Sequence, residues 1–211
     1  MDAVVLLDGG FLKRKYRSFA KKDITATEVE TIAKNVIASM PFSCKSYRVY
    51  YYDCPPNGDT VNLRISSAKQ DFSKNPQYKR LSDLLQDLKH LDNFAVREGS
   101  LSFEGWRLKD SLIDKNGSVQ TQQLKDDDFL PVLKQKGVDM KIGLDMAWVS
   151  YERIAEHIIL ITGDSDFSPA VKTARRKGVF IHLFTLGHGV KNVLRDNVDT
   201  LDARPISAFL Q

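Results

Sequence analysis

Aspartates follow two of the short apolar runs of this chain, at places where several carboxylates could act together. Asp8 ends the first apolar run, and Asp164 and Asp166 come just after a later one. In an open parallel sheet, functional sites form at the carboxyl ends of the strands, so these side chains are expected at one rim. Asp145 lies where the chain enters a helix, and we expect it at the same rim.

Carboxylates gathered in this way predict a bound divalent cation. Two of them about 4 Å apart repel by about 4 kcal/mol at an effective dielectric constant near 20, so the cluster needs protons or a metal. The two cysteines, Cys44 and Cys54, lack metal-binding spacing, and oxygen ligands alone favour Mg²⁺ or Mn²⁺ over zinc. Such an ion suits phosphodiester hydrolysis because it activates water and offsets the charge that develops on the phosphate.

Basic residues that could bind the phosphates of a nucleic acid follow the same aspartates. Lys13, Arg14, Lys15 and Arg17 come soon after Asp8, and Lys13 and Arg14 are the candidates for phosphate contacts among them. The further candidates for phosphate contacts are Lys172, Arg175, Arg176, His188 and Lys191. His188 stands in a glycine-rich turn before a helix, where backbone N–H groups can bind an anion. The alternative is that the charges only solvate a helix face and that the turn is only a turn.

Each aspartate also has a structural interpretation. Asp8 precedes two glycines and could form a turn. Asp164 and Asp166 could cap the following helix, and Asp145 could be a helix N-terminal charge that the macrodipole favours. The four acids together are harder to explain structurally than any one of them.

Other candidate chemistry is weaker. Asp53 and Asp139 are interpreted as loop or turn acids, and Ser165 and Ser168 lack a histidine at a spacing typical of a nucleophilic triad. The chain has neither a dinucleotide-binding glycine motif nor a P-loop.

Strands and helices alternate along the chain, which predicts parallel βαβ units in an α/β domain. The apolar runs predict strands at 3–7, 46–52, 157–161 and 179–185. Thr25 and Glu28 form a candidate capping box for a helix that ends at Pro41. Residues 93 to about 119 predict short strands or hairpins, and Asp126–Asp128 could cap a short helix that ends at Gly137. A further helix is expected to bury one apolar face: Leu144, Ala147, Trp148, Tyr151, Ile154, Ala155 and Ile158.

Length and composition predict one globular domain over residues 1–211, with an insertion or excursion at about 60–120. The 211 residues are 42% hydrophobic and 27% charged, which excludes general disorder. The net charge of +4 is compatible with a polyanionic partner but does not demonstrate one.

The cysteine content and the start of the sequence predict a reduced, cytoplasmic protein. Two cysteines cannot form a disulfide framework. The first apolar run is too short for a signal peptide, and no run approaches the about 20 residues that span a bilayer. We therefore expect no membrane partner.

Three segments together resemble a known family. Residues 5–10 (VLLDGG), 136–145 (KGVDMKIGLD) and 161–169 (ITGDSDFSP) resemble the signatures of the NYN domain, in the LabA-like or DUF88 group of the PIN-like nuclease superfamily. Residues 50–56 and 96–99 are also typical of that group. The resemblance runs in order over roughly residues 3–203.

The resemblance implies a three-layer, PIN-like Rossmannoid fold with a mainly parallel central sheet, and a metal-dependent ribonuclease site. By motif position, the metal-binding acids would be Asp8, Asp145, Asp164 and Asp166. Asp139 matches the first acid of the middle motif, without a defined role. Many NYN domains have Asn three positions after the first Asp, where this chain has Phe11, so any contact from that asparagine is lost.

The expected function is therefore that of a Mg²⁺- or Mn²⁺-dependent endoribonuclease acting on single-stranded or structured RNA. Asp8, Asp164 and Asp166 would hold metal, and Asp145 would hold metal or orient the attacking water. One alternative is a non-catalytic RNA-binding or regulatory module on the same fold. Another is a small-molecule phosphohydrolase, which is weakened because no aspartate stands two positions after Asp8. Besides RNA, the expected partners are a second copy or another protein, bound through residues 60–120.

Overall fold

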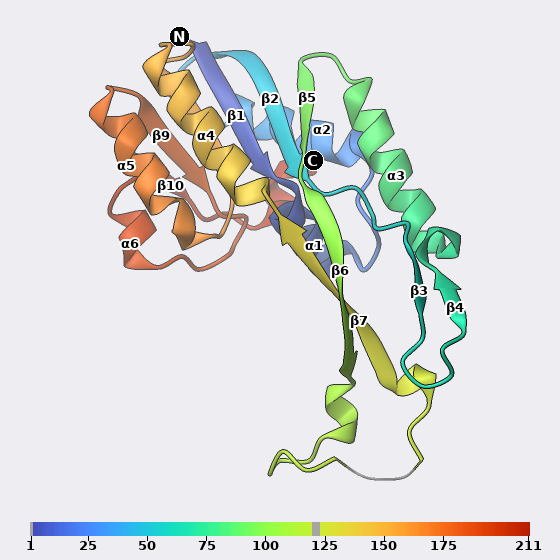
Figure 1. The fold of residues 1–211 in the computed structure, drawn as a ribbon. Helices are drawn as coiled ribbons and strands as arrows, with labels where there is room; N and C mark the ends of the chain where they lie inside the picture. Colours follow the sequence, from blue (N-terminus) through green and yellow to red (C-terminus); the bar gives the residue numbers. More distant parts are fainter. Residues whose placement is uncertain (1, 120–122) are drawn as a thin grey trace. The chain divides into compact units, whose positions relative to one another are not determined.

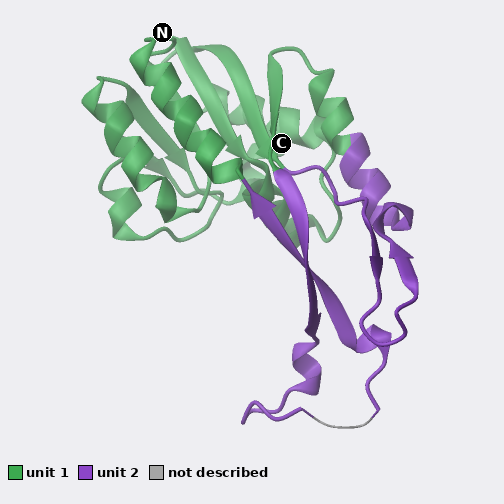
Figure 2. Cartoon of the chain, viewed as in Figure 1, with its two compact units in different colours: residues 1–53, 84–99, 137–211 green, residues 54–83, 100–136 purple. Residues whose placement is uncertain are grey.

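The computed structural model describes residues 2–119 and 123–211, so the last residue of the predicted insertion, at position 120, lies outside the described residues. The chain divides into two compact units (Figure 2). Unit 1 comprises Met1–Asp53, Leu84–Gly99 and Gly137–Gln211. Unit 2 comprises Cys54–Asp83 and Ser100–Lys136.

Unit 1 is built on a parallel sheet of six strands in the order β10-β9-β8-β1-β2-β5 (Figure 1). The strands are β1 (Asp2–Asp8), β2 (Lys45–Asp53), β5 (Phe94–Glu98), β8 (His157–Ile161), β9 (Phe180–Phe184) and β10 (Thr200–Asp202). The helices are α1 (Gly9–Ala20), α2 (Ala26–Ala38), the second half of α3 (Pro76–Lys89), α4 (Val138–Tyr151), α5 (Ser168–Arg176) and α6 (Asn192–Arg195). Single 3-10 turns lie at η4 (Ser165–Phe167) and η5 (Ile206–Phe209).

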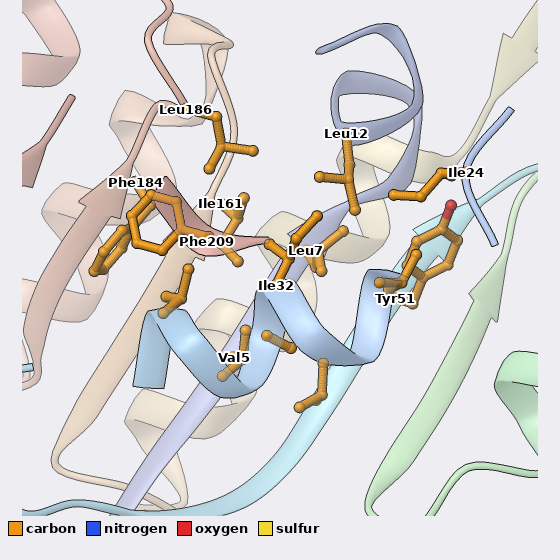
Figure 3. Packing of buried hydrophobic residues seen from close by; sticks show 14 of the residues in the cluster. Val5, Leu7, Leu12, Ile24, Ile32, Tyr51, Ile161, Phe184, Leu186 and Phe209 are labelled. Carbon is orange, nitrogen blue, oxygen red and sulfur yellow. The ribbon is translucent and has the colours of Figure 1, made fainter. Parts of the chain in front are cut away.

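Helices cover both faces of this sheet, which confirms the predicted α/β architecture. Residues of α1, α2, α3 and η5 share one apolar cluster with every second residue of the central strands, such as Val5, Leu7 and Tyr51 (Figure 3). Helices α4 and α5 pack on the other face. Residues 3–7 of β1 are fully buried, as expected for a strand with an apolar run and no polar alternation. The capping box of Thr25 and Glu28 is present at the start of α2.

Unit 2 consists mainly of two antiparallel hairpins. One pairs β3 (Thr60–Asn62) with β4 (Lys69–Asp71), and the other pairs β6 (Ser100–Leu108) with β7 (Phe129–Lys136). The unit also contains the first half of α3 and three 3-10 turns: η1 (Phe72–Lys74), η2 (Asp110–Leu112) and η3 (Asp126–Asp128). The rings of Phe72, Phe103 and Trp106 pack together.

Two predictions about helices are wrong. The segment from Asp126 to Gly137 is a single 3-10 turn followed by strand β7, because Pro131 cannot donate a helical hydrogen bond and the strand pairs with β6 instead. Helix α4 begins at Val138, and its buried residues are Val138, Ile142, Met146, Val149 and Ser150. The predicted core residues Leu144, Trp148 and Tyr151 are 61%, 41% and 58% exposed. Both faces of α4 are apolar, so periodicity could not identify the buried one.

Two smaller expectations also change. Strand β5 pairs parallel with β2 at the edge of the six-stranded sheet, so this part of the predicted excursion belongs to unit 1. Ser168 and Pro169 are typical of a helix start, with Ser168 expected as the N-cap, but Ser168 is the first residue of α5 and its hydroxyl donates to the Val193 carbonyl at 2.7 Å instead. Among the described helices, none has the length and apolar character that crossing a membrane requires.

Two buried histidines of unit 1 should make the folding stability of the protein decrease in acid. His157 Nδ1 lies 2.9 Å from His182 Nε2, and His182 Nδ1 lies 2.8 Å from the Thr200 hydroxyl. Burial, together with the neighbouring His157, lowers the pKa of His182 to about 4. Because the unfolded chain binds this proton near pH 6.5, the contribution of His182 to stability is complete above pH 6.5. It is lost as the pH falls from 6.5 through about 4, and the full loss is about 3 kcal/mol.

The measurement is the free energy of unfolding in urea at pH 7 and pH 4.5. We expect the difference between the two values to shrink in His182→Gln, which cannot take up this proton. His90→Gln, at an exposed position of the chain, is the control. An undiminished pH dependence in His182→Gln contradicts the prediction.

Candidate active site

The sheet order brings the ends of β1 and β8 together. These two strands are neighbours, and β1 pairs with β2 on its other side. The chain connections run outward in opposite directions from β1 and β8, so a topological switch point lies between these strands, where α/β sheets bind ligands. Asp8 ends β1, and Thr162, Gly163 and Asp164 follow β8.

Asp8 is held rigidly at this rim. It caps α1, because Oδ1 accepts the backbone N–H of Phe11 at 2.9 Å, while Oδ2 accepts the hydroxyl of Thr162 at 3.0 Å. The same Thr162 oxygen accepts the backbone N–H of Asp164 at 3.2 Å, so one side chain links the two acidic segments. Burial raises the pKa of Asp8 despite these hydrogen bonds and the nearby Arg14, and Asp139 raises it further.

Asp139 joins the same group of acids from the first turn of α4. Burial raises the pKa of Asp139, and the charges of Asp164 and Asp166 add to the effect. Asp164 in turn accepts the backbone N–H of Asp166 at 2.9 Å. The structure therefore places Asp8, Asp139, Asp164 and Asp166 within electrostatic reach of one another, and Asp139 is more than the isolated loop acid that we expected.

A pocket of about 450 Å³ opens beside these acids. It is lined by Asp8, Phe11, Arg14, Lys15, Gly163, Asp164 and His188. Two carboxylates thus share one cavity with two cationic side chains and an imidazole. This combination can bind a phosphate group and hold it against the carboxylates.

Phe11, three positions after Asp8, lines the pocket. Its ring meets the His188 ring edge-on, with 5.8 Å between centroids. Both rings lie against Gly163, because a Cβ there would come within 2.5 Å of His188 Cδ2 and 2.7 Å of Phe11 Cε2. A larger residue at position 163 would therefore displace one of these rings, and glycine lets the two rings form one wall of the pocket.

Asp145 lies in a different set of contacts. Its carboxylate accepts the Tyr52 hydroxyl at 2.8 Å and Arg97 Nε at 3.0 Å, and the Arg97 guanidinium stacks on the Tyr50 ring. The two partners of Asp145 come from β2 and β5, and Tyr50 of β2 supports Arg97. Asp145 thus has intramolecular partners in this structure, and its role as a metal ligand or water-orienting base stays a prediction.

The Arg97–Asp145 pair predicts a measurable stability effect. We expect Arg97→Gln to destabilise the protein by about 1 kcal/mol, because it removes a charge-assisted hydrogen bond to a half-buried carboxylate. The double mutant with Asp145→Asn should be less destabilised than the sum of the single mutants, in urea unfolding at pH 7. Arg64→Gln, at an exposed position, is the matched control. Strict additivity would show that the pair contributes nothing.

The predicted phosphate contacts separate into three groups. Arg14 and His188 line the pocket, and the backbone N–H of Lys191 donates to the hydroxyl of Ser165 at 3.3 Å, beside the acidic loop. Lys13 instead forms an ion pair of 2.5 Å with Asp53, which is almost fully buried and also accepts the Tyr51 hydroxyl. These contacts agree with the structural interpretation of Asp53.

The third group lies toward the far end of α5. Lys172, Arg175 and Arg176 line a separate pocket of about 540 Å³ with residues such as Phe180 and Asp199. Arg175 is paired with Asp199 at 3.0 Å. At a rise of about 1.5 Å per residue, Arg176 lies about 12 Å along the helix from its start near the acidic loop. We expected these cations near the acids because they follow Asp166 closely in the sequence, but they lie farther along the helix.

The acids partly fit a divalent cation. Their ligand atoms are all carboxylate oxygens, which suit Mg²⁺ or Mn²⁺. The pKa values of Asp8 and Asp139 are raised mainly by burial and further by neighbouring acids, and a bound cation would stabilise the charged form of both. Among the described residues, however, no three His, Cys, Asp or Glu side chains lie close enough to hold an ion in their present positions. The carboxylate oxygens are suitable ligands for Mg²⁺ or Mn²⁺, but the side chains would have to move before three of them could coordinate one ion.

Sequence reasoning missed Thr162 and the Tyr52–Asp145 contact. Thr162 is fully buried, and its position between the strand and the acidic loop is a signal that could have identified it. The Tyr52 contact joins residues 93 positions apart, and no local pattern indicates it.

Comparison with known proteins supplies the family. The family model of the NYN domain matches residues 59–202, more than half of the chain. The chain belongs to the NYN domain family. NYN domains are part of the PIN-like nuclease superfamily, which suggests ribonuclease activity, and PIN-like nucleases generally use divalent metals. The matched segment includes Asp139, Asp145, Asp164 and Asp166, whereas Asp8 precedes it.

Two further comparisons add less. No curated protein matches this NYN domain sequence. A crystal structure of a protein of unknown function from Vibrio parahaemolyticus RIMD 2210633 is similar at 14% identity, with a TM-score of 0.49, over 95% of this chain and 90% of that chain.

Proposed function

We propose that this NYN domain is a metal-dependent endoribonuclease of the LabA-like or DUF88 group, with its active site in the pocket between β1 and β8. The observation that carries the proposal is the shared pocket of Asp8, Asp164, Arg14, Lys15 and His188 at the switch point of the sheet. Together with the superfamily of the domain, this combination of acids and cations favours cleavage of a phosphodiester.

Each residue of the pocket has a separate role in the proposed reaction. Arg14 and Lys15 bind the phosphate and place it beside the acids, and His188, in the wall of the pocket, contacts the nucleotide next to that phosphate. Asp8 is oriented by its two hydrogen bonds, so its carboxylate is pre-positioned before substrate binds.

Asp8, Asp139, Asp164 and Asp166 would hold Mg²⁺ or Mn²⁺. When bound, the ion supplies an activated water and offsets the negative charge of the phosphate. Asp139 enters this set because its pKa is raised by burial and by Asp164 and Asp166. Asp145 would support the site from its contacts with Tyr52 and Arg97.

A non-catalytic RNA-binding module is the second candidate. Two observations favour it. The Phe11 ring occupies a wall of the pocket, and no three acids among the described residues lie close enough together to hold a metal ion. Such a module would bind RNA through the same cations, with a steep dependence on salt and without turnover.

The proposal also includes a cytoplasmic location. The Cys54 thiol donates to the Ser100 carbonyl at 3.2 Å, and Cys44 also carries a thiol. Two cysteines are too few for a disulfide framework, which suits a reducing compartment.

The test compares labelled single-stranded RNA, DNA of the same sequence and nucleoside monophosphates as substrates, each with Mg²⁺, with Mn²⁺ or with EDTA. We expect RNA cleavage with either ion and none with EDTA. RNA that is bound but never cleaved would support the non-catalytic module. Release of phosphate from the monophosphates alone would support a small-molecule phosphohydrolase.

A further inference from the structure

Unit 2 contains a second pocket, of about 370 Å³, which lies within the size range of small-molecule sites. Its walls are mainly apolar and include Phe72, Tyr78, Leu81 and Leu133. All of its lining residues belong to this unit, and the active site proposed above uses none of them. Phe72 is buried and continues into the aromatic cluster with Phe103 and Trp106.

Tyr78 forms a fixed aromatic wall. It lies in the first turn of α3, and its backbone N–H donates to the Asn75 carbonyl at 2.8 Å. Gly58 lies directly against its ring, because a Cβ at position 58 would come within 3.1 Å of Tyr78 Cε2. The ring is therefore held in place from one side and contributes to the pocket wall.

Side-chain amides provide the polar part of the lining. Asn57 donates to the Leu101 carbonyl at 3.0 Å, and its oxygen accepts the backbone N–H of Asp59. The Asn75 oxygen accepts the backbone N–H of Gln77, so both asparagines are part of the framework. Gln70 and Gln77 are exposed, and within the described part of the chain their amide groups form no side-chain hydrogen bond.

This lining selects a flat, neutral ligand that both donates and accepts hydrogen bonds. The lining side chains are uncharged, so a phosphate or a carboxylate has no ion partner inside the pocket. Glutamine amides offer one donor and one acceptor in the plane of a base edge, and aromatic rings stack on base faces. Outside the pocket, Lys69 and Lys79 adjoin Gln70 and Tyr78 in the sequence and are exposed, where they can contact phosphates.

We propose that this pocket binds one unstacked nucleobase of an RNA chain and gives the protein a base preference. Tyr78 stacks on the base, and Gln70 and Gln77 bind its edge. This inference rests on the proposed function insofar as RNA is the substrate, but it concerns binding in unit 2 and not cleavage in unit 1.

The test measures binding of four fluorescently labelled homopolymeric RNAs of about 12 nucleotides to a cleavage-deficient parent, Asp8→Asn. We expect the parent to prefer one base. Tyr78→Leu should weaken binding of that RNA about 5- to 100-fold, whereas Tyr78→Phe, which keeps the ring, should bind like the parent. The pair Gln70→Ala/Gln77→Ala should reduce the preference about tenfold. Gln86→Ala, on the same helix but outside the pocket, is the matched control.

The outcomes separate this inference from the proposed function. Equal affinity of the parent for all four RNAs, or unchanged binding in Tyr78→Leu with an unchanged melting temperature, would overturn the base pocket even if the wild type cleaves RNA. Loss of base preference in the pocket variants would support it even if the wild type cleaves nothing. Binding of an apolar peptide that leaves RNA affinity unaltered would also overturn it.

Discussion

Replacing Asp8 by asparagine should reduce RNA cleavage at least about 100-fold while leaving the protein as stable as the wild type, or more so. The activity falls because a neutral amide can neither bind a divalent ion strongly nor act on a water molecule. The fold survives because asparagine is an equally good helix N-cap whose amide oxygen can still accept the Phe11 N–H, while its amide nitrogen can donate to the Thr162 oxygen in place of the hydrogen bond that Asp8 Oδ2 accepts. Burial raises the pKa of Asp8, so the substitution also removes an unfavourable buried charge.

The measurements are single-turnover cleavage with Mn²⁺ and thermal unfolding of the same preparations. Asp126→Asn, in the 3-10 turn of unit 2, is a matched control that should cleave like the wild type. Full activity in Asp8→Asn would remove Asp8 from the catalytic group. A strong loss of stability together with activity would instead identify Asp8 as a structural cap.

Replacing Gly9 by alanine should destabilise the protein by about 1–3 kcal/mol or more, the largest stability effect that we expect from one methyl group. A Cβ at this position would come within 2.5 Å of Tyr51 Cζ and 2.7 Å of its hydroxyl oxygen. Tyr51 is fully buried in the core of unit 1 and donates to Asp53. Its ring therefore cannot move aside without disturbing both the core and the buried ion pair.

Gly143→Ala provides the comparison within the same unit. Its Cβ would meet Ala170 Cβ at 3.8 Å, an ordinary contact, and alanine in a helix interior is favoured over glycine by about 0.5–1 kcal/mol. Urea unfolding should thus show opposite signs for the two substitutions. If Gly9→Ala is neutral, the close packing of α1 on β2 described above is wrong.

The main architecture followed from the sequence because burial on both faces leaves a clear pattern. Residues 3–7 are apolar without alternation, and they form the central strand β1. The rule that sites form at strand ends then placed Asp8 and Asp164 together, and both line one pocket in the structure. Their chemical roles remain predictions.

The features that could not be predicted from the sequence depend on contacts between residues far apart in the chain. Arg97 and Asp145 are 48 positions apart, and the Lys13–Asp53 ion pair joins α1 to the end of β2. Helix α4 misled the prediction because both of its faces are apolar, so only packing on the sheet decides which face is buried. Closeness in the sequence also did not indicate the position of Arg175 and Arg176. They line a separate pocket, because helix α5 leads away from the acidic loop.

The most direct test of the active site is cleavage of a circular single-stranded RNA, which has no ends and is opened only by an endonuclease. Wild type and Asp164→Asn would be purified identically and assayed with Mn²⁺. Asp164 shares the pocket with Asp8, and its side chain is exposed. We predict that the wild type linearises the circle and that Asp164→Asn leaves it closed. Equal linearisation by both proteins would contradict an active site at these carboxylates.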